Sequence, residues 1–209
     1  FIFPAFPVAT RPRIFGGQVI AQALAAATLT VDVSKPAHSL HAYFLRGGDE
    51  GKPLHFRVHR DFDGRSFSNR RVVVRQDGKV IFNLTASFQA PEKGMEFQSP
   101  MPEVLPPEEC LDFIEHLAMD PNISEEEMIR SARRRPFDMR THRPLSTETG
   151  QSSHYQWYRV AAPIADDRDL HRNMLAFVSD MGLLTSSLLP HGLTWSTPGL
   201  MSTSLDHAM

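Results

Sequence analysis

The chain has 209 residues, of which 41% are hydrophobic and 22% charged, and its formal net charge at pH 7 is −2. This composition is that of a globular protein, and the charge provides no electrostatic basis for binding nucleic acid or an anionic membrane. No segment has the apolar length of a membrane span. The single cysteine, Cys110, excludes an intrachain disulfide, and its acidic neighbours disfavour a reactive thiolate.

Residues 1–90 predict one complete α+β module. After an irregular lead, Gly16 and Gly17 open a helical pattern of small and apolar residues, which is typical of a helix inside a domain. Strand patterns follow at residues 38–45, 54–59, 67–75 and 80–89. Asp77-Gly78 predicts a tight hairpin turn between the last two strands. One buried helix followed by antiparallel strands indicates the α+β class.

Residues 91–150 differ in composition and are expected to form a linker with two surface helices. One helix is predicted around residues 108–119, and a second begins after Ser124, a suitable capping residue. Residues 136–151 are expected to be irregular.

Residues 151–209 repeat the theme of the first module. A strand is predicted at 154–160, a mostly apolar helix at 169–189, and a further strand from 201 onward. The chain begins at Phe1 and stops inside this last strand, so we expect a fragment that holds one module and the first part of another.

Common nucleophile, cofactor and metal motifs are absent from the sequence. Residues 64–68 lack the closing glycine of a nucleophile elbow, and there is no phosphate-binding glycine loop. His38 and His41 would point to opposite faces of a strand, so we expect no metal site. Asp206 and His207 are adjacent on a predicted strand, where neighbouring side chains point to opposite sides, so they cannot form one catalytic relay.

Asp180 is the strongest candidate for a functional residue. It is the only charged residue between 174 and 184, an otherwise mostly apolar run. A buried carboxylate needs a partner, and the hydroxyl of Ser204 on a following strand can provide one. Together the two side chains can position a water molecule and accept its proton. The alternative, which spacing alone favours, is that Asp180 ends the helix near Gly182 and faces solvent, with Ser204 an ordinary strand residue.

Several stretches, in the same order along the chain, resemble the acyl-CoA thioesterase II family. They are residues 13–24 (RIFGGQVIAQAL), 38–46 (HSLHAYFLR), 63–72 (DGRSFSNRRV), 78–82, 85–89, 179–180, 189–191 and 204–209 (SLDHAM). The resemblance implies an α+β double hotdog fold, in which two modules each wrap an antiparallel sheet around a long helix. It also implies hydrolysis of fatty acyl-CoA thioesters to free acid and CoA without a cofactor.

The resemblance assigns roles to two residues. Asp180 stands where the family has its catalytic Asp, and Ser204 stands where it has a Thr or Ser. A third residue, a Gln, is expected beyond Met209, so the second hotdog is expected to be C-terminally truncated here and this fragment to be inactive or unstable. Gly16-Gly17 is interpreted as a close-packing turn, or else as a pseudo-equivalent site. Arg46, Arg65 and Arg70 are interpreted as surface and interface charges, or else as contacts for CoA phosphates.

Two other functions stay open at this point. One is a non-catalytic acyl-CoA-binding module, and the other is an acyl-CoA hydratase or dehydratase, which would favour a His where Gln18 stands. The expected partners are the acyl-CoA substrate and further copies of the same chain in a homo-oligomer, with no nucleic acid and no membrane span. The expected location is cytoplasmic, or alternatively peroxisomal.

Overall fold

The computed structural model describes residues 2–3, 13–120, 122–131, 136–142, 153–194 and 196–209. The chain divides into two compact units that are built from interleaved segments. The first comprises Phe1–Met95, Ala165–Met181 and Thr203–Met209, and the second comprises Glu96–Ile164 and Gly182–Ser202. The division near residues 90 and 150 stays a prediction.

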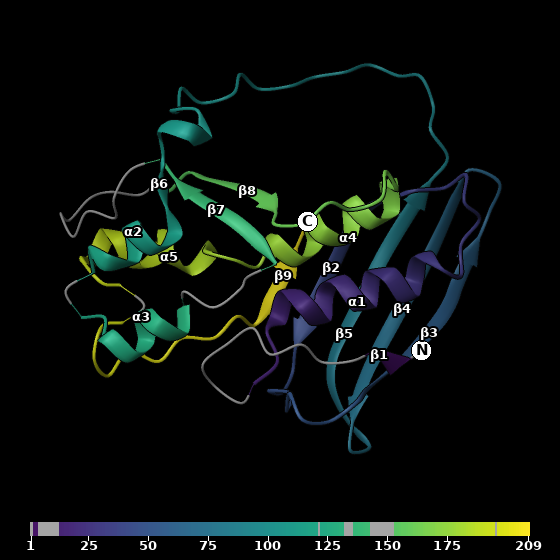
Figure 1. The fold of residues 1–209 in the computed structure, drawn as a ribbon. Helices are drawn as coiled ribbons and strands as arrows, with labels where there is room; N and C mark the ends of the chain where they lie inside the picture. Colours follow the sequence, from purple (N-terminus) through teal and green to yellow (C-terminus); the bar gives the residue numbers. More distant parts are fainter. Residues whose placement is uncertain (1, 4–12, 121, 132–135, 143–152, 195) are drawn as a thin grey trace. The chain divides into compact units, whose positions relative to one another are not determined.

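The first unit is a helix packed on an antiparallel sheet. In the described residues the sheet has six strands, in the order β1 (Ile2–Phe3), β3 (Leu54–Asp63), β4 (Phe67–Gln76), β5 (Lys79–Gln89), β2 (Ala37–Phe44) and β9 (Asp206–Ala208). Helix α1 (Gly16–Thr28) crosses these strands, and α4 (Arg168–Val178) lies beside it (Figure 1). The predicted α+β class and its helix-on-sheet hotdog arrangement are confirmed.

The predicted hairpin between β4 and β5 is also present. Gln76 pairs with Lys79 across the turn, and both turn residues, Asp77 and Gly78, have positive φ angles of 48° and 76°. Positive φ at both positions suits the right-handed twist of the flanking strands. The alternation that follows turns one face of the sheet toward α1, and the buried side chains of this core include Ile20, Leu24, Phe56, Val72, Val74, Leu84 and Phe88.

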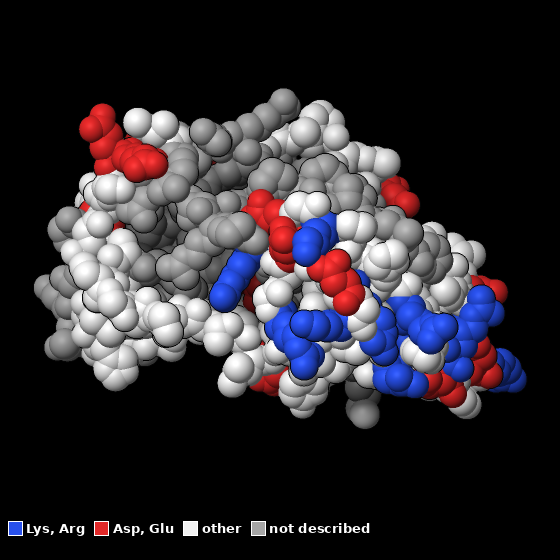
Figure 2. Space-filling model, turned by 90° about the horizontal axis from the view of Figure 1, so that it is seen from below, with Lys and Arg blue, Asp and Glu red and all other residues white. Residues whose placement is uncertain are grey.

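The outer face of this sheet is polar and charged. Arg57, Arg71 and Arg75 are exposed there, and Arg71 pairs with Asp61 (Nε to Oδ2, 3.0 Å). Figure 2 shows Lys and Arg side chains gathered on part of one face, with Asp and Glu side chains among them. Exposed pairs of this kind contribute at most about 1 kcal/mol each, so burial of the inner face supplies the stability of the sheet.

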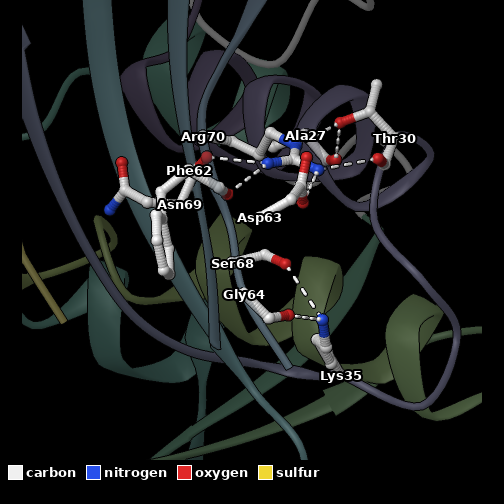
Figure 3. Close-up of polar contacts among 9 residues, drawn as sticks. All are labelled: Ala27, Thr30, Lys35, Phe62, Asp63, Gly64, Ser68, Asn69 and Arg70. Atoms are coloured by element: carbon white, nitrogen blue, oxygen red, sulfur yellow. Dashed lines mark hydrogen bonds and ion pairs between the residues drawn. The ribbon is translucent and has the colours of Figure 1, made fainter. Parts of the chain in front are cut away.

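Arg70 is a buried exception, with a side chain only 1% exposed. Its five N–H groups donate to Thr30 Oγ1 and the Thr30 carbonyl, to the Phe62 and Asn69 carbonyls, and to Asp63 Oδ1, over 2.6–3.0 Å (Figure 3). These bonds tie the chain just after α1 to the β3–β4 turn. Neither interpretation of Arg70, as a surface charge or as a phosphate contact, is right, because the guanidinium is buried and fully bonded.

The second unit holds the rest of the described secondary structure. Its elements are η1 (Pro107–Glu109), β6 (Leu111–Asp112), α2 (Phe113–Ala118), α3 (Glu125–Ser131), β7 (Phe137–Thr141), β8 (Gln156–Val160), α5 (Leu183–Leu188) and η2 (Leu189–His191). Strands β6, β7 and β8 form an antiparallel sheet in that order. The two predicted helices exist as α2 and α3. The expectation of irregular chain over 136–151 is wrong for β7, and residues 143–152 lie outside the described ones.

The first of these helices begins later than predicted. Residues 107–109 form a separate 3-10 turn, and α2 starts only after Asp112. Asp112 caps α2 by accepting from the N–H groups of Ile114 and Glu115, while Glu115 accepts from the Asp112 N–H. This reciprocal capping box fixes where α2 begins.

The single helix predicted over residues 169–189 is two helices. Helix α4 ends at Val178, and α5 starts at Leu183 after Gly182, which has a left-handed φ of 78°. A left-handed residue interrupts the hydrogen-bond ladder, and glycine adopts it without a steric penalty. Asp180 therefore lies in the turn after α4. The last strand, expected from residue 201, is shorter than predicted and spans Asp206–Ala208.

Candidate active site

Asp180 is held between the end of α4 and the start of α1. Its side chain is 8% exposed, and its carboxylate accepts a hydrogen bond from the Gly17 N–H. A Cβ at Gly16 would lie 2.6 Å from Asp180 Oδ2, and one at Gly17 would lie 2.2 Å from the Phe177 carbonyl oxygen. The interpretation of the two glycines as a close-packing turn is confirmed, since only residues without a side chain permit this approach.

Burial controls the ionisation of Asp180. It raises the pKa of the carboxyl from 3.8 to about 6, and the hydrogen bond from Gly17 opposes the rise. A carboxyl group with a pKa in this range is a better proton acceptor than an exposed one and is still ionised at neutral pH. The alternative in which Asp180 faces solvent is wrong, although the helix does end before Gly182.

The Asp180 carboxyl lines a pocket of about 330 Å³ in the first unit. Most of the lining is apolar, and Arg13 and Arg46 also contribute; its larger apolar side chains are Ile14, Val19, Phe44, Leu45, Ile81, Phe82 and Leu205. Arg46 is partly engaged, because it donates to the Val80 carbonyl (2.6 Å). Arg65 is not among the lining residues of this pocket.

Ser204 lines the same pocket as Asp180. It lies half-buried in the segment that leads into β9, and the next residue fixes this segment, because the Phe44 N–H donates to the Leu205 carbonyl (2.9 Å). Among the contacts of the described residues, none is a hydrogen bond between Ser204 and Asp180. The fold thus brings the two predicted residues to one pocket, whose walls they share without a hydrogen bond between them.

His207 is a further residue of this site that sequence reasoning set aside. Strand alternation does send Asp206 and His207 to opposite faces, as predicted: Asp206 contacts His41 outside, and His207 is 4% exposed inside. Its Nδ1 lies 3.8 Å from Asp180 Oδ1, and its Nε2 lies 2.9 Å from Ser179 Oγ. His207 is therefore hydrogen-bonded to Ser179, with Asp180 just beyond hydrogen-bond distance, and no local sequence pattern reveals this arrangement.

Burial also acts on the ionisation of His207. It lowers the pKa of the imidazole, whereas the negative charge of Asp206 raises it.

In the described part of the chain, no helix is long and apolar enough to cross a membrane.

Comparison with known proteins assigns both halves of the chain to acyl-CoA thioesterases. Residues 7–89 match the family model of the acyl-CoA thioesterase N-terminal domain, and residues 129–209 match that of acyl-CoA thioesterase. Acyl-CoA thioesterase 2 of Haemophilus influenzae is 34% identical over 203 residues, covering 94% of this chain and 70% of that protein. Human acyl-coenzyme A thioesterase 8 is 37% identical over 209 residues, covering 94% and 65%.

Solved structures agree with these matches. An acyl-CoA thioesterase II from Mycobacterium marinum is 38% identical with a TM-score of 0.72, covering 93% of this chain and 69% of that one. The tesB protein of Mycobacterium avium subspecies paratuberculosis is 29% identical with a TM-score of 0.77, covering 100% and 71%. The chain spans about two thirds of the length of the curated relatives it matches. With both halves matched and this identity, the chain belongs to the acyl-CoA thioesterase II family.

Proposed function

We propose that the protein hydrolyses fatty acyl-CoA thioesters to the free acid and CoA, with a water molecule activated by Asp180. The observation that carries the proposal is the buried carboxyl of Asp180 at a mostly apolar pocket, with a pKa of about 6. The relatives named acyl-CoA thioesterase support the thioester as the substrate.

The chemistry needs few groups, because a thioester carbonyl is already electrophilic. A water molecule placed between Asp180 and Ser204 gives its proton to the carboxylate as its oxygen attacks the carbonyl carbon. Ser204 orients this water and does not itself attack the thioester. Among the described residues, no histidine is bonded to Ser204, so a group that would activate it as a nucleophile is not in place.

The pocket lining suits the two ends of the proposed substrate. Apolar side chains such as Val19, Phe44 and Phe82 offer a surface for a hydrocarbon chain, whose burial is favourable by about 0.8 kcal/mol per methylene. Arg13 and Arg46 are exposed at the same pocket and can meet anionic groups of CoA. This combination favours a long acyl chain over a short polar one.

The two alternatives predict different results. A non-catalytic module would bind acyl-CoA without turning it over, and a hydratase would act on an unsaturated acyl chain without releasing thiol. The hydratase has less support, because the helix start carries buried Gln18 and no histidine.

The proposal also includes assembly into a homo-oligomer and a location that is cytoplasmic or else peroxisomal. For the peroxisomal location, a yeast peroxisomal thioester hydrolase matches only 41% of the chain.

Thiol release from acyl-CoAs of different chain lengths tests the proposal directly. The full-length protein is compared with its Asp180→Asn variant, which keeps the size of the side chain and an acceptor for the Gly17 N–H. We expect kcat to fall by roughly a hundredfold to ten thousandfold, the usual effect of losing a general base.

Asp169→Asn serves as the matched control, since Asp169 lies in the first turn of α4 and pairs with Arg172. Its kcat is expected to stay within about twofold of the native protein, because partly exposed ion pairs contribute little. Undiminished turnover by Asp180→Asn rejects the assignment of the base. Binding of acyl-CoA without any thiol release by the native protein rejects hydrolysis and favours the binding module.

A further inference from the structure

His207 lies close to the candidate base. It lies on β9, and its imidazole is buried with Nδ1 3.8 Å from Asp180 Oδ1, slightly beyond hydrogen-bond range. The Gly17 N–H donates to the same carboxyl from the first turn of α1. Asp180 therefore has a backbone donor and a titratable ring among its neighbours.

The neighbouring hydroxyl fixes the tautomer of this ring. Ser179 Oγ lies 3.0 Å from the Ala176 carbonyl oxygen, which can only accept, so the single hydroxyl hydrogen is used there. Ser179 Oγ must then accept from His207 Nε2, 2.9 Å away. In the neutral ring the proton is on Nε2, and the unprotonated Nδ1 faces Asp180.

An ionised carboxylate and an unprotonated Nδ1 are two acceptors that face each other. A proton placed between them satisfies both, whichever atom carries it formally, and such closely coupled groups titrate as a pair. The low exposure of both side chains strengthens this preference, because a pair that holds one proton has no net charge to bury.

We infer that His207 is a positioning residue that shares with Asp180 the proton taken from the attacking water. This inference rests on the proposed function of Asp180. The water O–H bond breaks as its oxygen bonds to the thioester carbon, and the proton goes to Asp180, where Nδ1 accepts a hydrogen bond from it. When the C–S bond breaks, the CoA thiolate takes this proton, and the pair returns to its starting state.

The surroundings leave few other groups to hold this proton. Helix α1 has no titratable side chain, and the last turn of α4 has no basic one. Asp206 on β9 influences His207 through its charge, and His41 on β2 contacts Asp206 on the outer side. Arg13 and Arg46 also line the pocket. Burial raises the pKa of Asp180 and lowers that of His207, which brings the two closer together.

The test is the pH profile of kcat for the full-length protein and two variants. His207→Gln can place its amide nitrogen where Nε2 stands and keep the bond to Ser179, but it has no atom at the position of Nδ1. His207→Asn can reach Asp180 but cannot carry a proton. We expect the midpoint of the acid limb to move to lower pH by about one unit in His207→Gln, because protonated Asp180 loses its hydrogen-bond acceptor, and by less in His207→Asn, whose amide oxygen can still accept. Plateau kcat should fall about tenfold or more in His207→Gln and less in His207→Asn.

His55→Gln is the matched control, since His55 is exposed on the outer face of β3, and its profile should equal that of the native protein. Folded variants whose acid midpoint is unchanged overturn the inference. If the variants do not fold, nitrogen NMR of His207 in the native protein provides the test. A proton on Nε2 at pH values above the midpoint of the acid limb supports the inference. The Nδ1–H tautomer rejects it. A native protein without thioesterase activity refutes the proposed function, while this NMR measurement still tests the pair.

Discussion

Two buried charged side chains in this protein differ in how completely they are bonded. The five N–H groups of Arg70 all donate, and its pair with Asp63 completes the set. Asp180 has a donor in the Gly17 N–H, and His207 Nδ1 lies 3.8 Å away, beyond hydrogen-bond distance. A fully bonded charge is fixed, whereas an incompletely bonded carboxyl keeps the capacity to accept a proton. Arg70 thus serves the fold, and Asp180 is available for chemistry.

Removal of the Ser204 hydroxyl tests the proposed role of this residue. We expect Ser204→Ala to lower kcat by about ten- to a hundredfold, because the attacking water loses an orienting bond. Ser204→Thr keeps a hydroxyl and should retain most of the activity. Steady-state and burst kinetics of thiol release measure both. A loss in Ser204→Ala as complete as in Asp180→Asn, together with a burst in the native protein, would point to a covalent nucleophile instead.

Removing the Arg70 side chain should destabilise the first unit strongly. Arg70→Ala leaves carbonyls of Thr30, Phe62 and Asn69 without this donor, and an acceptor that stays buried and unmet costs about 1–3 kcal/mol. The next residue, Arg71, is exposed and pairs with Asp61, so Arg71→Ala should change the free energy of unfolding by less than about 1 kcal/mol. Chemical denaturation compares the two, and equal stabilities would contradict the structural role of Arg70.

At the scale of elements, the close approach of α1 and α4 builds the candidate site. The start of α1 has no side-chain cap, and its first residues are glycines against which the end of α4 packs directly. The left-handed Gly182 then ends the helical stretch, so that Asp180 sits in a turn and points toward α1. The position of the carboxyl therefore depends on two glycine features at opposite ends of the sequence.

The two glycines of α1 should respond differently to alanine. Gly17→Ala places a Cβ against the Phe177 carbonyl oxygen, a backbone atom that cannot move alone, so we expect a loss of about 1–3 kcal/mol despite the better helix propensity. Gly16→Ala meets the ends of the Asp180 and Phe44 side chains, which can rotate away. Gly16→Ala should therefore lower kcat clearly while changing the free energy of unfolding little. Thermal unfolding and turnover of both variants test this, and a stabilised Gly17→Ala would contradict the packing.

At the scale of the whole molecule, the raised pKa of Asp180 links stability to pH. The folded state binds the proton up to about pH 6, while the ordinary carboxyl of the unfolded chain releases it near 3.8. Between these values the folded state holds more protons, so stability falls as pH rises and stays lower above about pH 6.

Asp180→Asn removes this penalty. At neutral pH we expect the variant to be more stable than the native protein by up to about 3 kcal/mol, and the difference should vanish near pH 4. Denaturation at several pH values measures it. A variant that is less stable at neutral pH would show that the carboxylate contributes to folding, against the expectation of a site that trades stability for activity.

The sequence by itself determined the family, the α+β class, the β4–β5 hairpin and the choice of Asp180 and Ser204 as candidate residues. A local signal was sufficient for the hairpin, because Asp-Gly sets the turn, whereas the choice of Asp180 and Ser204 needed the family resemblance in addition to the lone carboxylate in an apolar run. The same local reasoning failed over Phe137–Thr141, where pairing with β8 makes a strand of a segment without a clear pattern. It also ran two helices together, because the conformation at Gly182 is not visible in hydrophobic periodicity.

Only the tertiary structure decided what surrounds these residues. His207 reaches Asp180 because β9 pairs with β2 and turns that side chain inward, and Arg70 is buried because Thr30, Phe62 and Asn69 converge on it. Sequence spacing does not reveal such contacts, because Asp180 and His207 are 27 positions apart and Thr30 and Arg70 are 40 positions apart. The ionisation of Asp180 follows from this packing, because burial raises its pKa and burial is a property of the fold.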